Sequence, residues 1–241
     1  MKNPILEQVL QSARRGRSSI LLATAALHRR LRNPLPGRFQ PVSHTLPDRY
    51  PWLFEFAARE LTPENLNILS FGCSRGDEVF TLRRYFPLAA LRGIDVDPRN
   101  IATCRARSGR DACMSFHAAA TTQGEPSNAF DAIFCLAVLV LGDLTTLDAE
   151  RCDPYLRFAD FETVVGDFAR CLKPGGLLFI HTSNFRFGDT AVARDFDVVL
   201  EAPPEQLAPD VVYDRSNRLL LGERYLPVGF RKHHHASSSS S

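Results

Sequence analysis

Between residues 68 and 180, short apolar runs alternate with longer amphipathic stretches, and this alternation limits the fold more than any other feature of the sequence. Apolar runs of strand length separated by helix-length segments are typical of βαβ units. Because βαβ crossovers are right-handed, they bury a mostly parallel sheet between two layers of helices. The sequence therefore predicts an α/β fold with a doubly wound sheet.

The apolar pattern also places the individual elements. Pro98 suits the first turn of a helix, and residues 174–176 (Pro-Gly-Gly) are expected to end the helix that precedes them. Apolar runs after residue 205 indicate late strands, so we expect an antiparallel hairpin to close a Rossmann-like sheet of seven strands. The predicted strands are 68–71, 91–95, 114–117, 130–135, 177–180, 211–213, 219–221 and 225–230, and the predicted helices are 51–61, 77–85, one from residue 98, and 158–172.

The chain is predicted to divide into three parts. Residues 1–48 contain basic amphipathic segments followed by a Pro-rich linker, and they are expected to form N-terminal helices that act as a cap or lid. Residues 49–232 are expected to form the α/β domain. Residues 233–241 are a low-complexity His/Ser tail that we exclude from the fold and expect to be disordered.

Residues 1–40 carry eight basic residues against one acid, Glu7, although the formal net charge of the whole chain is only +2. Such a segment favours a solvated helix face near an anionic substrate pocket, and it leaves open a contact with RNA or a membrane surface. An Arg-rich, acid-poor start also resembles an organelle transit segment, but no clear cleavage site follows it.

Six cysteines are scattered along the chain without a C-x-x-C pair. This spacing argues against a disulfide framework and against a zinc site. We therefore expect reduced thiols, a cytoplasmic location and no metal. The longest apolar runs, such as 131–142, are too short to cross a bilayer as helices, so no membrane span is predicted. The sequence does not indicate an oligomeric state.

A Gly-rich turn follows the first predicted strand of the alternation. Gly72 and Gly76 stand at its carboxyl end, where a residue without Cβ lets a ligand approach the backbone closely. A dinucleotide fingerprint would require glycines where Ser74 and Asp77 stand, so an NAD site is excluded by spacing. The Gly-Lys-Ser/Thr of a Walker phosphate loop is also absent.

Asp95 ends the second predicted strand. A carboxylate at this point can accept two hydrogen bonds from a ribose diol, which is the role of the acid in Rossmann-type sites. The alternative role for Asp95 is to cap the next helix. Asp97, directly before Pro98, is the better cap, and this leaves Asp95 for a ligand.

At these residues the chain resembles the class I S-adenosylmethionine-dependent methyltransferases. The resemblance covers roughly residues 62–185 and extends through FDAIFCLAVL at 130–139 and RCLKPGGLLFIHTSN at 170–184, which are similar to the family's fourth strand and its helix–PGG–fifth strand. It implies S-adenosylmethionine as cofactor. In that family the Gly-rich turn holds the methionine part, and the acid after the second strand holds the ribose.

The resemblance also implies a role for each matching position. Gly72, Cys73, Ser74 and Gly76 would line the methionine end, Asp95 would bind the ribose, Val96 would lie against the adenine, and Cys135 and Leu136 would lie beneath the cofactor near its amino group. Many members follow the third strand with an acidic or amide residue that bonds the adenine amine. Here His117 precedes three alanines, so that contact would come from the backbone, from Thr121 or Gln123, or be missing.

The catalytic residue is not identified by the sequence. His181, at the end of the fifth predicted strand, is the best-placed base, and its alternative role is a hydrogen-bonded histidine at a strand end. Loops at this edge carry specificity, and they place four further side chains where they could face the pocket. These are Asp143, Tyr155, Asn184 and Arg186.

Several acceptor classes stay open. The turn GCSRGDE is similar to that of the chemotaxis-receptor glutamate methyltransferases, but residues 136–143 lack the polar pair of that branch. The Asn/Asp-Pro-Pro-aromatic signature of enzymes that methylate base amines is absent at 135–138. The leading prediction is a methyltransferase for a small molecule, with residues 1–48 as its lid. The alternative is a cofactor-binding module, or an enzyme directed to RNA or protein by its basic N-terminus.

Overall fold

The computed structural model describes residue 39 and residues 45–61, 65–142, 144–145, 149–207 and 211–234. The predicted N-terminal helices, the basic cluster of residues 1–38, Asp143 and most of the His/Ser tail lie outside these residues. His233 and His234 are described: His233 Nε2 lies 3.2 Å from Asp197 Oδ1, and the His234 ring lies beside Gly175.

A seven-stranded sheet with the order β3-β2-β1-β4-β5-β9-β6 forms the centre of the fold. The first five strands of the chain are parallel, and β9 is antiparallel to both β5 and β6. The predicted doubly wound α/β fold with a late antiparallel hairpin is therefore confirmed. The strands are β1 (Asn67–Phe71), β2 (Ala90–Asp95), β3 (Met114–Ala118), β4 (Phe130–Leu136), β5 (Leu172–His181), β6 (Phe196–Glu201) and β9 (Pro227–Lys232).

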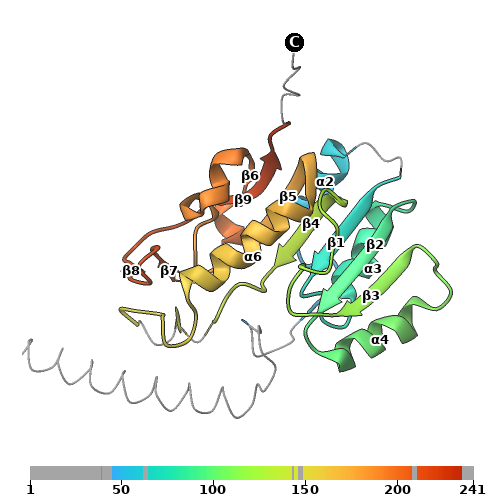
Figure 1. Ribbon diagram of the computed structural model, residues 1–241, viewed down its shortest axis with the longest axis horizontal. Helices are drawn as coiled ribbons and strands as arrows, with labels where there is room; N and C mark the ends of the chain where they lie inside the picture. The colour runs from blue at the N-terminus through green and yellow to red at the C-terminus, as the bar shows by residue number, and fades with distance from the viewer. Residues whose placement is uncertain are drawn as a thin grey trace, which may run out of the picture.

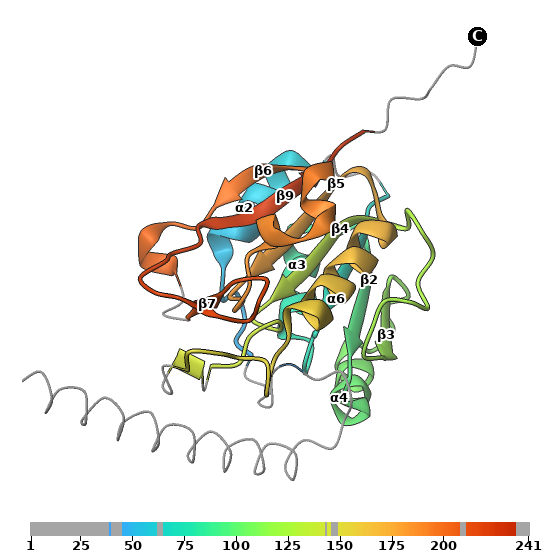
Figure 2. The same cartoon turned by 60° about the vertical axis from the view of Figure 1, so that its left-hand side comes forward.

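Helices cover both faces of the sheet (Figures 1 and 2). On one face lie α2 (Pro51–Glu60), α3 (Asp77–Tyr85) and α4 (Pro98–Ser108), and on the other lies α6 (Phe158–Cys171). Short 3-10 turns η1 (Phe187–Asp189), η2 (Ala191–Asp195) and η3 (Pro204–Gln206) connect the later strands. None of the helices within the described ranges is long and apolar enough to cross a membrane.

The strands divide their side chains between two cores, as the period of two in a strand requires. In β4, Phe134 and Leu136 pack toward α2, α3 and α4, whereas Ile133 and Cys135 pack toward α6. Both faces of the central strands are therefore buried, which is why these strands appear in the sequence as continuous apolar runs rather than as alternating ones.

The C-terminal part differs from the prediction in one respect. The strand β6 was not predicted, because its apolar run, residues 198–200, is only three residues long and is flanked by Asp197 and Glu201; it lies at the sheet edge, where Val198 is 53% exposed. It pairs with β9, which lies between β5 and β6. The predicted strands near 212 and 220 do form, as β7 (Val212–Tyr213) and β8 (Leu219–Leu220), but they make a separate two-stranded ribbon.

The Pro-Gly-Gly segment was predicted to end the preceding helix, and this was wrong. The helix α6 already ends at Cys171, and residues 174–176 lie within β5. There the pairing of β4 with β5 shifts from Phe130↔Leu172 to Ala132↔Leu177, so the segment is an irregularity within the strand. Gly175 has a φ of +76°, a conformation that suits glycine at such a bulge.

Two glycines in the described part differ in the space around them, so the same substitution to alanine should have opposite effects on stability. A Cβ on Gly93 in β2 would lie 2.6 Å from Phe116 and 2.9 Å from Cys73 Sγ, whereas a Cβ on Gly166 in α6 would meet no atom within 4 Å. We expect Gly93→Ala to lower the free energy of unfolding by about 1–3 kcal/mol through overpacking. Gly166→Ala should raise it by about 0.5–1 kcal/mol through helix propensity. Urea unfolding of both proteins measures the difference, and equal effects would contradict the packing described here.

Candidate active site

The strand order reverses between β1 and β4, which lie side by side in the middle of the sheet (Figure 1). A cleft lies there, at the carboxyl ends of the first four strands. Ligands of open α/β sheets bind at such a switch point. Segments that follow each of the four strands contribute to it, together with the residues before α2. The lining residues are Phe39, Thr45, Leu46, Asp48, Arg49, Tyr50, Phe54, Phe71, Gly72, Cys73, Ser74, Glu78, Thr81, Asp95, Val96, Ala119, Ala120, Leu136, Ala137 and Val138.

The turn after β1 has left-handed backbone at three positions. Gly72 has a φ of +72°, Ser74 a φ of +50° and Gly76 a φ of +92°. The amides of Gly72 and Cys73 both donate to the Ile94 carbonyl, at 2.7 and 2.9 Å, which ties the turn to β2. A Cβ on Gly72 would lie 2.5 Å from the Val138 side chain, so glycine is required here both for the conformation and for the close approach of the segment after β4.

Asp95, which is only 7% exposed, accepts three hydrogen bonds that fix its carboxylate. The Ser74 amide donates to Oδ2 at 2.9 Å, and the Asp97 amide and Asn100 Nδ2 donate to Oδ1 at 2.8 and 3.0 Å. The predicted division of roles is confirmed for the second acid, because Asp97 caps α4 by accepting from the Arg99 amide at 2.9 Å. Oδ2 of Asp95, with one donor, retains capacity for a ligand hydroxyl.

The Ser74 side chain supplies a second polar group to the cleft. Ser74 is 8% exposed, and its hydroxyl has no hydrogen-bond partner among the described residues. A buried hydroxyl without a partner costs free energy, and in a native structure such a group points to a ligand or an ordered water. Together with Asp95, it gives the cleft adjacent polar groups that suit a polyhydroxyl or zwitterionic ligand.

The structure brings most of the predicted cofactor residues together. Gly72, Cys73, Ser74, Asp95, Val96 and Leu136 line the cleft. Gly76 does not: it lies at the N-cap of α3 with a φ of +92°, where a Cβ would meet Phe80 at 2.8 Å. Cys135 is buried on the α6 side of β4, opposite to Leu136, and burial raises the pKa of its thiol well above the usual value. Gly76 and Cys135 are therefore not among the residues that line the cleft.

Glu78 lines the cleft and was not singled out from the sequence. It lies in the first turn of α3 and accepts from Ser70 Oγ at 2.7 Å. Burial raises the pKa of Glu78 from 4.5 to about 7, while the Ser70 hydrogen bond and the charge of Arg49 act in the opposite direction. An acid two residues after the last glycine of the Gly-rich turn, Gly76, was the available signal. A bound cation at this carboxylate would favour its ionised form.

The residues that were proposed for contact with the adenine amine lie in the segment after β3. Ala119 and Ala120 line the cleft, whereas Thr121 and Gln123 are not among the lining residues. The wall at this position is therefore formed by small apolar side chains and backbone.

His181, the predicted base, ends β5 and contacts the cleft residue Tyr50, but it is not itself among the residues that line the cleft. It is 3% exposed, and its ring packs at a tilt of 30° against Tyr50, with 4.5 Å between ring centroids. The centroid of the Trp52 ring lies 5.7 Å away. Nδ1 is 2.7 Å from Thr182 Oγ1. Burial, with a smaller effect of Arg49, lowers the pKa of His181 to about 4, although the Gln206 carbonyl acts in the opposite direction. The imidazole is therefore neutral at physiological pH.

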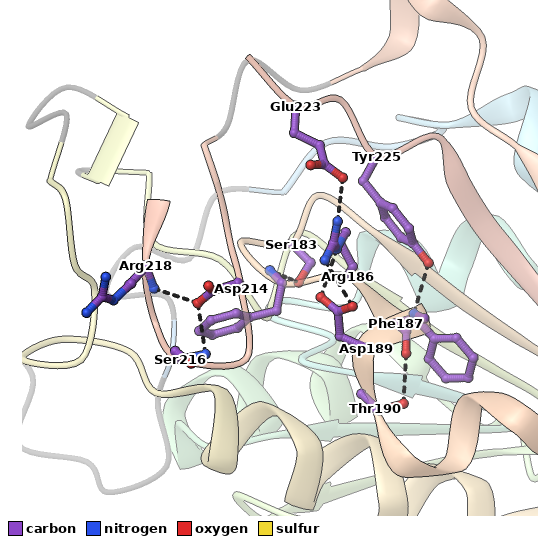
Figure 3. Close-up of polar contacts among 12 residues, drawn as sticks. Ser183, Arg186, Phe187, Asp189, Thr190, Asp214, Ser216, Arg218, Glu223 and Tyr225 are labelled. Carbon is purple, nitrogen blue, oxygen red and sulfur yellow. Dashed lines mark hydrogen bonds and ion pairs between the residues drawn. The ribbon is translucent and has the colours of Figure 1, made fainter. Parts of the chain in front are cut away.

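The other candidate side chains have structural partners. Asn184 is fully buried, accepts from the Leu141 amide at 2.6 Å and donates to the Val211 carbonyl at 2.9 Å. Arg186 is bound to Asp189 and Glu223 (Figure 3). Tyr155 packs against the core on the α6 side and is not among the residues that line the cleft.

A comparison with models of protein families gives a match that includes most of the residues lining this cleft. Residues 69–180 match the family model described as a methyltransferase domain. This part of the chain is therefore similar to methyltransferase domains. The match supports S-adenosylmethionine as the cofactor of this domain. The match begins in β1 and ends in β5, so it contains the Gly-rich turn, Asp95 and the segment after β4.

Solved structures with partial likeness include the cyclase SpnF (23% identity, TM-score 0.40, 53% of this chain and 42% of that one). Coclaurine N-methyltransferase bound to N-methylheliamine and SAH gives 13% identity, a TM-score of 0.40, and 56% and 36% coverage. An S-adenosylmethionine-dependent methyltransferase from Mesorhizobium loti gives 22% identity and a TM-score of 0.38, and the match covers 52% of this chain and 51% of that one. The chain thus matches about half the length of these proteins or less. No curated protein matches the sequence.

The raised pKa of Glu78 gives the stability of the fold a pH dependence of defined sign. Between 4.5 and about 7 the folded state holds a proton that the unfolded state has released. This stabilisation is present at acidic pH and is lost as the pH rises through about 7. We expect Glu78→Gln to remove this slope and to be more stable than wild type by about 1–3 kcal/mol at about pH 8.

Urea unfolding at a series of pH values measures this difference. Glu55→Gln, at an exposed position of α2, is the matched control and should follow the wild-type curve. A constant difference between wild type and Glu78→Gln across the pH range would show that Glu78 does not titrate as described.

Proposed function

We propose that this protein transfers a methyl group from S-adenosylmethionine to a small-molecule acceptor. The observation that carries the proposal is the fixed carboxylate of Asp95 beside the unpartnered Ser74 hydroxyl, at the switch point of the sheet. These groups fit the cofactor that the family uses, because they offer a hydrogen-bond acceptor for a ribose diol and a free polar group next to it.

The remaining cleft residues fit the other parts of the cofactor. Val96 and the small side chains of Ala119 and Ala120 would bind the adenine through apolar contact. Glu78 would bind the positively charged amino group, and the turn at Gly72 would allow the methionine part to approach the backbone. When bound, S-adenosylmethionine supplies a methyl group that its sulfonium already activates. The protein therefore contributes mainly by positioning the acceptor and excluding water.

A small molecule is the acceptor that the cleft favours. Residues before α2, including Phe39, Leu46, Arg49 and Tyr50, line one side of the cleft and limit the access of a large polymer. The basic segment that would favour RNA lies outside the described residues. Incubation with methyl-labelled cofactor and a size-fractionated cell extract tests the choice. Label in low-molecular-weight products is expected, and label confined to RNA or protein would overturn the small-molecule acceptor.

Cofactor binding itself is tested by calorimetry with a matched pair of substitutions. Asp95→Asn places an amide NH₂ among groups that already donate, and it removes part of the acceptor for the ribose. Asp97→Asn makes the same change of charge two residues away but retains a good helix cap. We expect Asp95→Asn to weaken S-adenosylmethionine binding by about tenfold or more, since hydrogen bonds to charged groups contribute about 1.5–3 kcal/mol. Asp97→Asn should bind as wild type does, and equal affinity of all three proteins would contradict the site.

A further inference from the structure

Two cysteines from distant parts of the chain contact each other beside the cofactor cleft. Cys73 lies in the turn after β1 and lines the cleft, whereas Cys104 lies in α4. Their side chains are buried, with exposed fractions of 2% and 0%, and the two thiols are hydrogen-bonded to each other. Both are free cysteines in this structure. The spacing of these two residues in the sequence does not predict their contact.

The other buried cysteines have different surroundings. Cys171 Sγ lies 3.6 Å from the Thr122 carbonyl, and Cys152 Sγ lies 3.8 Å from the Asn217 carbonyl. Within the described part of the chain, neither of them is hydrogen-bonded to a second thiol. Cys73 and Cys104 are therefore the described pair that is placed for a sulfur–sulfur bond.

The Ser74 peptide connects this thiol pair to the cofactor cleft. Cys104 Sγ donates to the Ser74 carbonyl at 3.2 Å, and Cys73 Sγ lies 3.8 Å from the same oxygen. The Ser74 amide donates to Asp95 Oδ2 at 2.9 Å, and the Ser74 hydroxyl has no hydrogen-bond partner among the described residues. A change at the two sulfurs therefore acts on the same residue that positions the groups assigned to the cofactor.

The two thiols differ in acidity and in access. Their mutual hydrogen bond, followed by burial, raises the pKa of Cys73, whereas the same hydrogen bond lowers the pKa of Cys104. Cys73 is the one that a small oxidant reaches, because it lines the cleft. Since the thiolate is the reactive form, oxidation at Cys73 should become faster as the pH rises, and Cys104 is suited to attack in a second step.

We propose that Cys73 and Cys104 form a reversible disulfide, with hydrogen peroxide as the oxidant, and that this bond prevents cofactor binding. The effect on cofactor binding rests on the proposed function. In the first step the Cys73 thiolate attacks a peroxide oxygen, the oxygen–oxygen bond breaks, and hydroxide leaves. In the second the Cys104 thiolate attacks the sulfur of the Cys73 sulfenic acid, the sulfur–sulfur bond forms, and a second hydroxide leaves. The two hydroxides take up the two thiol protons, so the products are one disulfide and two waters.

The disulfide would change the turn in two ways. A sulfur–sulfur bond of about 2.05 Å is shorter than a hydrogen-bonded contact of two thiols, so Cys73 Sγ has to move toward α4. The Cys73 amide and carbonyl are each held at 2.9 Å, by the Ile94 carbonyl and the Gly76 amide, so the turn is displaced with the side chain. Oxidation also removes the hydrogen that Cys104 donates to the Ser74 carbonyl, and a buried carbonyl without a donor is unfavourable.

Disulfide formation is tested on the full chain with Cys113→Ser, which removes an exposed thiol that could join two molecules. After peroxide treatment, we expect the intact mass to fall by two hydrogens and a peptide map without reductant to contain the Cys73–Cys104 link. The link should form faster at about pH 8.5 than at about pH 7. S-adenosylhomocysteine at about ten times its Kd should slow formation about tenfold, because it occupies the cleft. Absence of the link in the oxidised protein, or no protection by bound S-adenosylhomocysteine, would overturn the proposal.

Calorimetry with S-adenosylhomocysteine measures the effect on the cleft. The linked protein should bind at least about tenfold more weakly than the reduced protein, since the arrangement of Ser74 and Asp95 is disturbed. Dithiothreitol should restore the original affinity. Equal affinity of the linked and reduced proteins would show that the disulfide does not control the cofactor site.

Two alanine substitutions separate the disulfide from other oxidation. Cys104→Ala removes the partner thiol from a residue outside the cleft lining, so no link should form and peroxide should weaken binding less than in the parent protein. Cys171→Ala removes an equally buried thiol at the end of α6 and should behave as the parent protein does. An equal loss of binding in peroxide-treated Cys104→Ala would exclude the disulfide as the cause. The protection experiment needs neither variant.

Failure of this inference is distinguishable from failure of the proposed function. The link is detected by mass, without any cofactor, whereas the cofactor site is measured by calorimetry on the reduced protein. No binding of S-adenosylmethionine to the reduced protein would refute the proposed function. Binding that is unaffected by a link between Cys73 and Cys104 would refute this inference alone.

Discussion

The hydrogen bonds accepted by the Asp95 carboxylate hold three elements of the fold in one arrangement. Its donors come from the turn after β1, from the residue that caps α4, and from the first turn of that helix. A buried carboxylate is costly unless donors surround it, so the ends of β1, β2 and α4 are constrained to meet there. The left-handed conformation of Ser74 and the shape of the cofactor cleft both depend on this meeting point.

The fold was predictable because both faces of its central strands are buried. Apolar runs separated by amphipathic helices identify such strands directly, and α3 over 77–85 was placed at its observed ends. Most of the predicted cofactor residues also meet in one cleft, since the carboxyl ends of parallel strands lie at the same edge. Asp97 could be recognised as a cap from Pro98 alone, which left Asp95 for the ligand.

What the sequence did not reveal depends on contacts between distant segments. The edge strand β6 has an apolar run of only three residues, too short to mark a buried strand. The Pro-Gly-Gly segment lies within β5 because β4 pairs on both sides of it. The environment of Glu78 and the contact between Cys73 and Cys104 arise only when the segment before α2 and the helix α4 pack against the sheet. No local pattern in the sequence predicts these contacts between distant segments.

The position of β9 between β5 and β6 has a consequence for how the molecule is assembled. Residues 227–232 form an interior strand of the sheet, although they are synthesised long after the parallel strands. The position between β5 and β6 therefore stays empty until β9 has been made. Until it inserts, β5 presents an unpaired edge, which is a template for association with other chains. None of the described residues that line the cofactor cleft comes from β9, so nascent chains are expected to form the cleft before this strand inserts.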